Sequence, residues 1–448
     1  MSSPLSSERL AITRAALAHA HLAYERHHPE ASPRRQPVHT MYGGAHLFTA
    51  QTAQKMGRTA VNALREYAPD GRALAACLGL DEALAERVHA RVLTKLEREP
   101  VEDFRIDFED GYGHRPDEEE DGHATSAAIA LARGLAEGTL PPFVGIRVKA
   151  LTEELFDRSA RTLGLFLGTL LDRTGGRLPP GFVVTLPKVS LPQEVTALVR
   201  MLELLETDYG LEPGALKLEL MVETPRALYT PDGRLALPAL VEAAHGRCVA
   251  AHLGPYDYTA SLHITAAQQD LSHPACDFAR NVMQVSLAGS GVALSDGPTN
   301  VLPVAPHKPG AHPLTEAQRE ENHQVVHRAW RHMYTNTRHA LERGFYQGWD
   351  LHPAQLPVRY AAVYAFFLEG LEVASRRLKS FVEQAARATR LGEVFDDAAT
   401  GQGLLNSFLR GLACGAVTEE EARATGLTLE ELRGRSFLRI LQGRRPPE

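Results

Sequence analysis

Residues 103–113 read DFRIDFEDGYG, and this stretch decides how the rest of the chain is interpreted. Its first part has the apolar and aromatic content of a β-strand, and its second part is an acidic turn that ends at glycine. The same order returns from about Val38 to Pro353: a short apolar run, a polar turn and a longer stretch with helical periodicity. Such repetition is typical of βα units that build a parallel sheet.

Eight short runs are predicted to be the strands of this sheet. In chain order they are VHTMYGG (38–44), DFRIDFED (103–110), FVGIRVKA (143–150), FVVTLPKV (182–189), LKLELMVE (216–223), CVAAHLG (248–254), GVALSDG (291–297) and GWDLHP (348–353). Eight βα units favour a closed (β/α)8 barrel, the TIM-barrel fold. A doubly wound sheet would more often carry a glycine-rich phosphate turn, and no G-x-G-x-x-G or P-loop motif is present.

The barrel is predicted to span residues 37–356, with a helical segment on each side. Residues 1–36 are expected to form a helical arm and a linker, because apolar residues at helical spacing precede the proline-rich, charged stretch HHPEASPRRQP. Residues 357–448 return to helical periodicity, so they are expected to form a C-terminal helical extension.

Composition argues against several functional classes. The net charge of −7 gives no broad cationic surface, so neither nucleic acid nor a membrane is an expected partner. The four cysteines form no C-x-x-C pair, which indicates reduced thiols rather than a disulfide framework or a zinc ribbon. No signal-peptide core is present, and no stretch approaches the roughly 20 apolar residues of a membrane-spanning helix. We therefore expect a soluble, cytoplasmic protein.

The polar residues of the predicted strands gather at their C-terminal ends, where barrel enzymes place their active sites. They are Asp107, Glu109, Asp110, Arg147, Lys149, Lys188, Glu223, Asp257, Asp296, Asp350 and His352. Converging carboxylates would raise one another's pKa values unless a cation balanced them. Because no cysteine or histidine cluster has ligand spacing, the expected cation is Mg²⁺, with Mn²⁺ as the alternative, bound by carboxylates and water.

Six motifs resemble, in order, the strands of the citrate lyase beta-subunit and malyl-CoA lyase group of the HpcH/HpaI aldolase superfamily. They are DFRIDFEDGYG, GIRVKAL, VVTLPKV, LELMVETPRAL, AAHLGPYDYTASL and GWDLHPAQL. The resemblance implies a barrel of the phosphoenolpyruvate/pyruvate-binding type. It also implies a homo-oligomeric, metal-dependent carbon–carbon lyase or aldolase acting through an enolate on a small 2-oxo or hydroxy acid or a CoA thioester.

The resemblance also implies residue roles. Glu223, in an E-T motif, and Asp257, in a G-x-x-D motif, would bind Mg²⁺, and Arg147 would grip the substrate carboxylate and the enolate oxygen. The expected catalytic set adds Glu109, Asp110 and Lys188 to Arg147, and the expected substrate contacts add Asp107, Lys149 and Pro255.

The general base stays open. The candidates are a carboxylate next to the metal ligands, a metal-bound hydroxide, His252, and an acid of the C-terminal extension. The sequence departs from the group's pattern at Lys149, where asparagine is usual, and in the extension, where the glycine-rich segment with a catalytic aspartate is not recognisable. Asp396 or Asp397 could take that part.

Other functions could use the same barrel. A Schiff-base aldolase would need Lys149 or Lys188 as its nucleophile, and the pair Glu223 and Asp257 argues against it. A phosphotransferase acting on phosphoenolpyruvate, a CoA-thioester hydrolase and a non-catalytic binding protein are the remaining alternatives. His323 and His327 lie four apart on a predicted helix, but without the H-E-x-x-H glutamate a packed or solvated helix face is expected.

Overall fold

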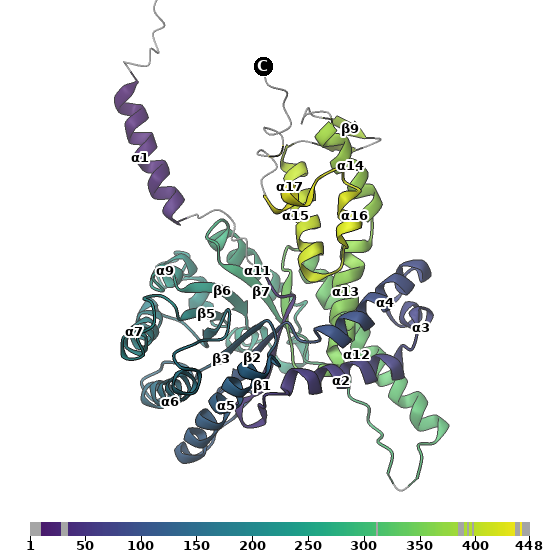
Figure 1. Cartoon of the computed structure of the whole chain (residues 1–448), viewed down its shortest axis with the longest axis horizontal. Helices are drawn as coiled ribbons and strands as arrows, with labels where there is room; N and C mark the ends of the chain where they lie inside the picture. The colour runs from purple at the N-terminus through teal and green to yellow at the C-terminus, as the bar shows by residue number, and fades with distance from the viewer. Residues whose placement is uncertain are drawn as a thin grey trace, which may run out of the picture.

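The computed structural model describes residues 10–27, 35–310, 312–383, 389–391, 394–396, 398–434 and 440. Eight parallel strands close a barrel in chain order, and β8 pairs with β1 (Figure 1). They are β1 (His39–Gly44), β2 (Asp103–Asp107), β3 (Phe143–Arg147), β4 (Val183–Leu186), β5 (Lys217–Val222), β6 (Cys248–Leu253), β7 (Ala293–Pro298) and β8 (Gln347–Asp350). Each predicted run overlaps one strand, so the predicted TIM barrel is confirmed.

Helices surround the barrel and fill the connections between its strands. Those up to β8 are α2 (Thr52–Tyr67), α3 (Gly71–Leu78), α4 (Glu82–Arg98), α5 (Asp117–Glu137), α6 (Phe156–Thr174), α7 (Pro192–Asp208), α8 (Pro225–Leu228), α9 (Leu237–Glu242), α10 (Pro255–Ser261), α11 (Pro274–Leu287) and α12 (Glu316–Glu342). Short 3-10 turns follow β1 (Ala45–Leu47), precede α11 (Ala266–Gln268) and follow β8 (Pro353–Gln355). The first connection therefore holds three helices where a simple barrel has one.

Local sequence signals set where several helices begin. Asp70 and Asp81 accept hydrogen bonds from the backbone amides of Ala73 and Leu84, at 2.8 and 3.1 Å, and so cap α3 and α4. Thr315 begins α12 with a reciprocal capping box. These caps satisfy amides that the helices leave unpaired, so the sequence fixes these boundaries without help from the core.

The barrel interior is charged, although branched aliphatic side chains usually fill such interiors. Arg105 of β2 donates two hydrogen bonds, of 2.9 and 2.6 Å, to Glu219 of β5, and a third to Asp103. Thr40 donates to Asp103 at 2.9 Å, and Thr185 donates to Glu219 at 3.0 Å. Because β2 and β5 are not neighbours, these contacts cross the centre of the barrel and fill it beneath the C-terminal mouth.

Beyond β8 the chain is mainly helical, as predicted. It forms α13 (Leu356–Leu368), α14 (Leu371–Glu383), the two-stranded pair β9 (Thr389–Leu391) and β10 (Val394–Asp396), α15 (Ala398–Cys414), α16 (Glu419–Arg423) and α17 (Leu429–Arg433). α13 packs against α12 and α4, as the eighth outer helix of a barrel would. We therefore propose that the extension begins at α14 rather than at residue 357.

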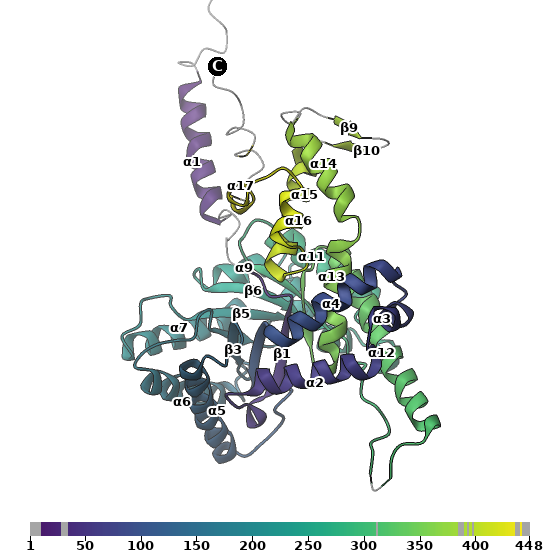
Figure 2. The same cartoon turned by 45° about the vertical axis from the view of Figure 1, so that its right-hand side comes forward.

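The extension stands on one side of the barrel, and α1 (Ala11–His27) lies apart from the barrel in both views (Figures 1 and 2). Arg91 of α4 pairs with Glu421 of α16 at 2.7 Å and so ties the extension to the first βα connection. Within the described residues, no helix has both the length and the apolar character required to cross a bilayer.

Candidate active site

The acidic turn after β2 is held in place by Asp107. Its carboxylate accepts hydrogen bonds from the amides of Glu109 and Gly111, at 3.0 and 2.7 Å. It also accepts two from Arg147 of β3, at 2.7 and 2.6 Å, and its side chain is fully buried. A Cβ on Gly111 would lie 2.5 Å from Asp107 Oδ2, so only glycine allows this approach. Asp107 therefore orders the turn and Arg147, and its predicted contact with substrate stays a prediction.

Arg147 is a buried cation among the acids of the mouth. Besides its two bonds to Asp107, its Nη1 lies 3.1 Å from Glu109 Oε2, and the ring of Tyr42 packs against the guanidinium at 4.9 Å. The neighbouring carboxylates hold the pKa of Arg147 well above its usual range in spite of burial. These contacts use three of the five guanidinium N–H groups, which leaves donors for a ligand.

Lys188 links the acids of different strands. Its backbone φ of 51° lies in the left-handed region, which residues other than glycine rarely adopt. In this conformation its backbone amide donates to Glu223 Oε1 at 2.6 Å, and its Nζ contacts Glu109, Asp110 at 3.1 Å and Asp257 at 3.3 Å. The structure thus brings together these four predicted acids from three connections, and strain is typical of functional positions.

Glu223 and Asp257, the predicted metal ligands, differ in burial. Glu223 is buried at the end of β5, and burial raises its pKa to about 8. Asp257 lies in the first turn of α10, and 43% of its side chain is exposed. Gly254 allows the approach of Glu223, because a Cβ there would collide with the carboxylate. Pro255, a predicted substrate contact, is buried at the start of α10.

The donor set fits a hard divalent cation. Among the described residues, one amide donates to Glu223 and one ammonium pairs with Asp257, so each carboxylate keeps an oxygen for an ion. The mouth holds five carboxylates, Asp107, Glu109, Asp110, Glu223 and Asp257, against the two cations Arg147 and Lys188. A divalent ion would offset most of this excess. Among the described residues, no three histidine, cysteine or acidic side chains are placed to hold one metal ion together, so water or substrate would complete the coordination.

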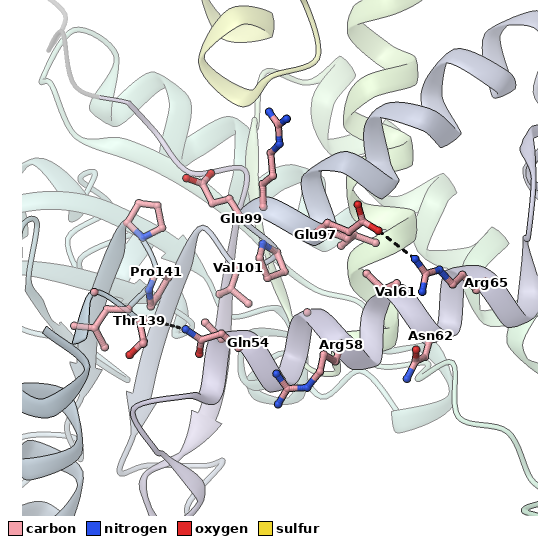
Figure 3. Close-up of a pocket in the computed structure, with 18 residues that line it drawn as sticks. Gln54, Arg58, Val61, Asn62, Arg65, Glu97, Glu99, Val101, Thr139 and Pro141 are labelled. Atoms are coloured by element: carbon pink, nitrogen blue, oxygen red, sulfur yellow. Dashed lines mark hydrogen bonds and ion pairs between the residues drawn. The ribbon is translucent and has the colours of Figure 1, made fainter. Parts of the chain in front are cut away.

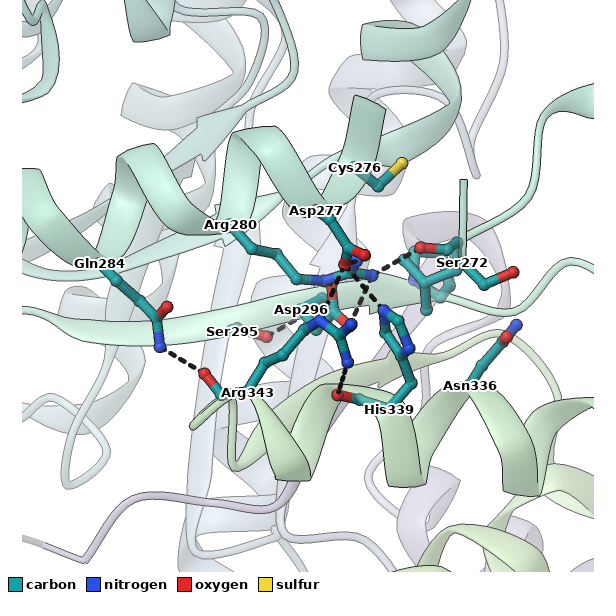
Figure 4. A network of polar contacts seen from close by, with 12 residues as sticks. Ser272, Cys276, Asp277, Arg280, Gln284, Ser295, Asp296, Asn336, His339 and Arg343 are labelled. Atoms are coloured by element: carbon teal, nitrogen blue, oxygen red, sulfur yellow. Dashed lines mark hydrogen bonds and ion pairs between the residues drawn. The ribbon is translucent and has the colours of Figure 1, made fainter. Parts of the chain in front are cut away.

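Three residues of the predicted ring do not face the mouth. Lys149 donates to the carbonyl of Phe108 at 2.6 Å and pairs with Glu120 of α5 at 2.9 Å. Asp350 pairs with Arg359 of α13 at 2.9 Å. Asp296 is held by Arg280 of α11 through bonds of 3.0 and 3.1 Å (Figure 4). The expectation that these charges join the ring is wrong, since each is neutralised on the outer side of the barrel.

Other candidates also lie away from the acids. His252 is inside the barrel with its Nε2 3.4 Å from Glu219, where it belongs to the charged interior. Asp396 ends β10, which lies at the end of the extension remote from the barrel (Figure 2), and Asp397 is outside the described residues. His327 contacts the carbonyl of Tyr67 at 2.6 Å, which confirms a packed helix face.

A cavity of about 660 Å³ opens at the other end of the barrel (Figure 3). Its walls come from α2, from the end of α4 and from the turn that precedes β3. Gln54 spans it by donating to the carbonyl of Thr139 at 3.0 Å. None of the predicted site residues lines this cavity, so the candidate site rests on the chemistry of the mouth.

Sequence reasoning missed two aromatic residues beneath Arg147, Tyr42 of β1 and Trp349 of β8. It also missed the crossing contact between Arg105 and Glu219. The alternation in DFRID and KLELMV was the available signal, because charged residues at every second position share one face of a strand. Nothing in the sequence showed that this face is the inner one.

Comparison with known proteins identifies the family of this chain. Residues 17–440 match the family described as Domain of unknown function (DUF6986), and the chain belongs to this family. No curated protein matches.

Three solved structures align with this chain. A citrate lyase from Burkholderia xenovorans LB400 aligns with a TM-score of 0.56 and 18% identity, covering 88% of this chain and 97% of that one. A Haloferax volcanii malate synthase aligns at 0.45 with 14% identity, covering 92% and 93%. CitE from Mycobacterium tuberculosis, in complex with magnesium, acetoacetate and coenzyme A, aligns at 0.46 with 17% identity, covering 86% and 100%. At 18% identity, the likeness to the citrate lyase concerns the fold alone.

Proposed function

We propose that the chain is a magnesium-dependent carbon–carbon lyase or aldolase acting next to the carbonyl of a small 2-oxo acid or its CoA thioester. The pair Glu223 and Asp257 carries the proposal, because both carboxylates keep spare oxygens beside Lys188, and Glu223 also lies within the field of Arg147. The shared fold of a citrate lyase across most of the chain supports the same class. Homo-oligomerisation and a cytoplasmic location stay predictions from the sequence.

The residues of the mouth would divide the work. Glu223 and Asp257 would hold the ion, and bound Mg²⁺ would supply a Lewis acid for a carboxylate and its neighbouring carbonyl. Arg147, fixed by Asp107, would orient the substrate carboxylate through its remaining N–H groups. Lys188 Nζ would keep its proton while paired with Glu109, and its positive charge would offset negative charge that develops on the substrate.

The test is product release from a substrate panel. Pyruvate, glyoxylate and acetyl-CoA would be measured from 2-oxo acids, 4-hydroxy-2-oxo acids, and malyl- and citramalyl-CoA, with Mg²⁺ and with EDTA. Glu223→Gln should lower metal-dependent turnover by more than about 100-fold, because it removes a charged ligand and keeps the shape. Turnover that survives both EDTA and this substitution would refute the metal assignment.

Glu206→Gln is the matched control. Glu206 is also buried, but it pairs with Arg247 at 2.6 Å on the outer side of the barrel. This variant should lose stability and keep its dependence on Mg²⁺. A panel without product for the wild-type protein would favour phosphotransfer or a binding role, and phosphoenolpyruvate turnover would separate those two.

A further inference from the structure

The ammonium group of Lys188 is shared by acids that come from two different connections of the barrel. Its Nζ pairs with Glu109, with Asp110 at 3.1 Å and with Asp257 at 3.3 Å. Glu109 and Asp110 belong to the turn after β2, whereas Asp257 lies in the first turn of α10, after β6. The Lys188 side chain is 33% exposed, so a ligand that enters the mouth from solvent can reach it. One accessible positive charge therefore lies against a proposed metal ligand.

The backbone of Lys188 contacts the other proposed metal ligand. With a φ of 51°, its amide donates a hydrogen bond to Glu223 Oε1 at 2.6 Å. Lys188 thus touches Glu223 through its main chain and Asp257 through its side chain. The amide orients a carboxylate, whereas the ammonium adds a charge. These two contributions can be separated, because a substitution removes the ammonium and leaves the amide in place.

A fixed ammonium group has opposite effects on the two ligands that the proposed function requires. It repels a divalent cation, and it competes with that cation for the carboxylate of Asp257. It attracts the carboxylate of an acid that enters the same mouth. A residue that only kept the site in shape would favour the binding of both ligands. The sign of the effect on each ligand therefore distinguishes an electrostatic role of Lys188 from a structural one.

We infer that Lys188 makes the mouth take up Mg²⁺ together with a chelating acid, because its ammonium weakens binding of the free ion and strengthens binding of the acid. The inference rests on the proposed function, since Glu223 and Asp257 are its metal ligands. The acid belongs to the small 2-oxo or 2-hydroxy acids, whose carboxylate and neighbouring oxygen can chelate the ion. Arg147, held by Asp107, would add a second positive charge for this acid. The free ion alone would bind weakly.

Lys188→Met tests the inference in the full-length chain, because it removes the charge and keeps most of the side-chain volume. Titration calorimetry would measure binding of Mg²⁺ alone, and then binding of oxalate with Mg²⁺ in excess. The dissociation constant of Mg²⁺ should fall about tenfold and that of oxalate should rise about tenfold, as expected for charges a few ångströms apart in a solvated site. Lys188→Gly should shift both constants in the same directions. Glycine adopts this φ without strain, so this variant keeps the amide contact with Glu223 even where methionine disturbs the fold.

Lys95→Met is the matched control, because Lys95 also joins two acids, Glu99 at 2.5 Å and Glu102 at 2.6 Å. Glu102 directly precedes β2, at the end of the barrel opposite the mouth, so this variant should melt at a lower temperature and keep both dissociation constants. If both constants rise in the Lys188 variants, the role of Lys188 is structural and the inference is overturned. Constants equal to those of the wild type would overturn it as well. Absence of Mg²⁺ binding to the wild type, with and without oxalate, would overturn this inference together with the proposed function.

Discussion

Replacing Arg105 with methionine should destabilise the barrel by about 3–5 kcal/mol at pH 7, because it leaves two buried carboxylates without their cation. Arg105 is 2% exposed and bonds to Glu219 at 2.9 and 2.6 Å and to Asp103. Methionine fills much of the volume of the arginine stem, so the loss is mainly electrostatic. This range is typical of variants in which one partner of a buried ion pair is removed.

The loss of stability caused by Arg105→Met should depend on pH in a defined direction. Burial raises the pKa of Asp103 already in the native protein, whereas Arg105 and His252 hold the pKa of Glu219 below its usual range against the effect of burial. Without Arg105, both folded-state pKa values should lie above those of the unfolded chain. Such groups stabilise the fold below the unfolded pKa, and this contribution is lost as pH rises through the folded pKa. The deficit should therefore be smallest near about pH 4 and grow towards neutral pH.

Urea unfolding followed by circular dichroism between pH 4 and 8 would measure the difference. Arg161→Met is the matched control, because Arg161 pairs with Asp121 at 2.6 Å but is largely exposed. Its change should be much smaller than that of Arg105→Met at every pH, because solvent screens an exposed ion pair. A deficit for Arg105→Met as small as that of the control, or one that does not change with pH, would refute the reasoning.

Two other perturbations have defined outcomes. Gly111→Ala should abolish magnesium-dependent turnover, because the added Cβ would lie 2.5 Å from Asp107 Oδ2 and displace the acidic turn. Gly122→Ala is the control: its Cβ would meet no atom within 4 Å, so this variant should retain turnover in the same assay. Burial opposes ionisation of Glu421, but hydrogen bonds from Arg91 lower its pKa to about 2. The contribution of Glu421 to stability is therefore present above the pKa of the unfolded chain and is lost as pH falls towards 2. Glu421→Gln should thus lower the melting temperature at pH 7 and match the wild type near pH 2; a difference that persists in acid would contradict this account.

The positions of the strands could be predicted because their signals are local. The run DFRIDFEDGYG and its seven counterparts carry both the strand pattern and the turn that ends it, and the structure places a strand in each. The helix caps at Asp70 and Thr315 are local in the same sense. Such signals act within a few residues and need no knowledge of the rest of the chain.

The partners of the polar residues could not be predicted in this way. Asp296 and Asp350 directly follow the inward residues Ser295 and Trp349, so alternation along the strands turns both acids outward. Arg280 and Arg359 then meet them from helices. Alternation could have excluded these two acids had the inner face been known, but their helical partners follow only from packing.

The sequence by itself determined the parallel barrel and the order of its strands, since both follow from periodicity and turn chemistry that neighbouring residues carry. Only the tertiary structure decided which charges converge at the mouth. Lys188 reaches Glu109 and Asp257 from another connection, whereas Lys149 turns to Glu120 on an outer helix. The physical reason is that electrostatic and hydrogen-bond energies depend on distances of a few ångströms between groups far apart in the chain, and closure of the barrel sets those distances.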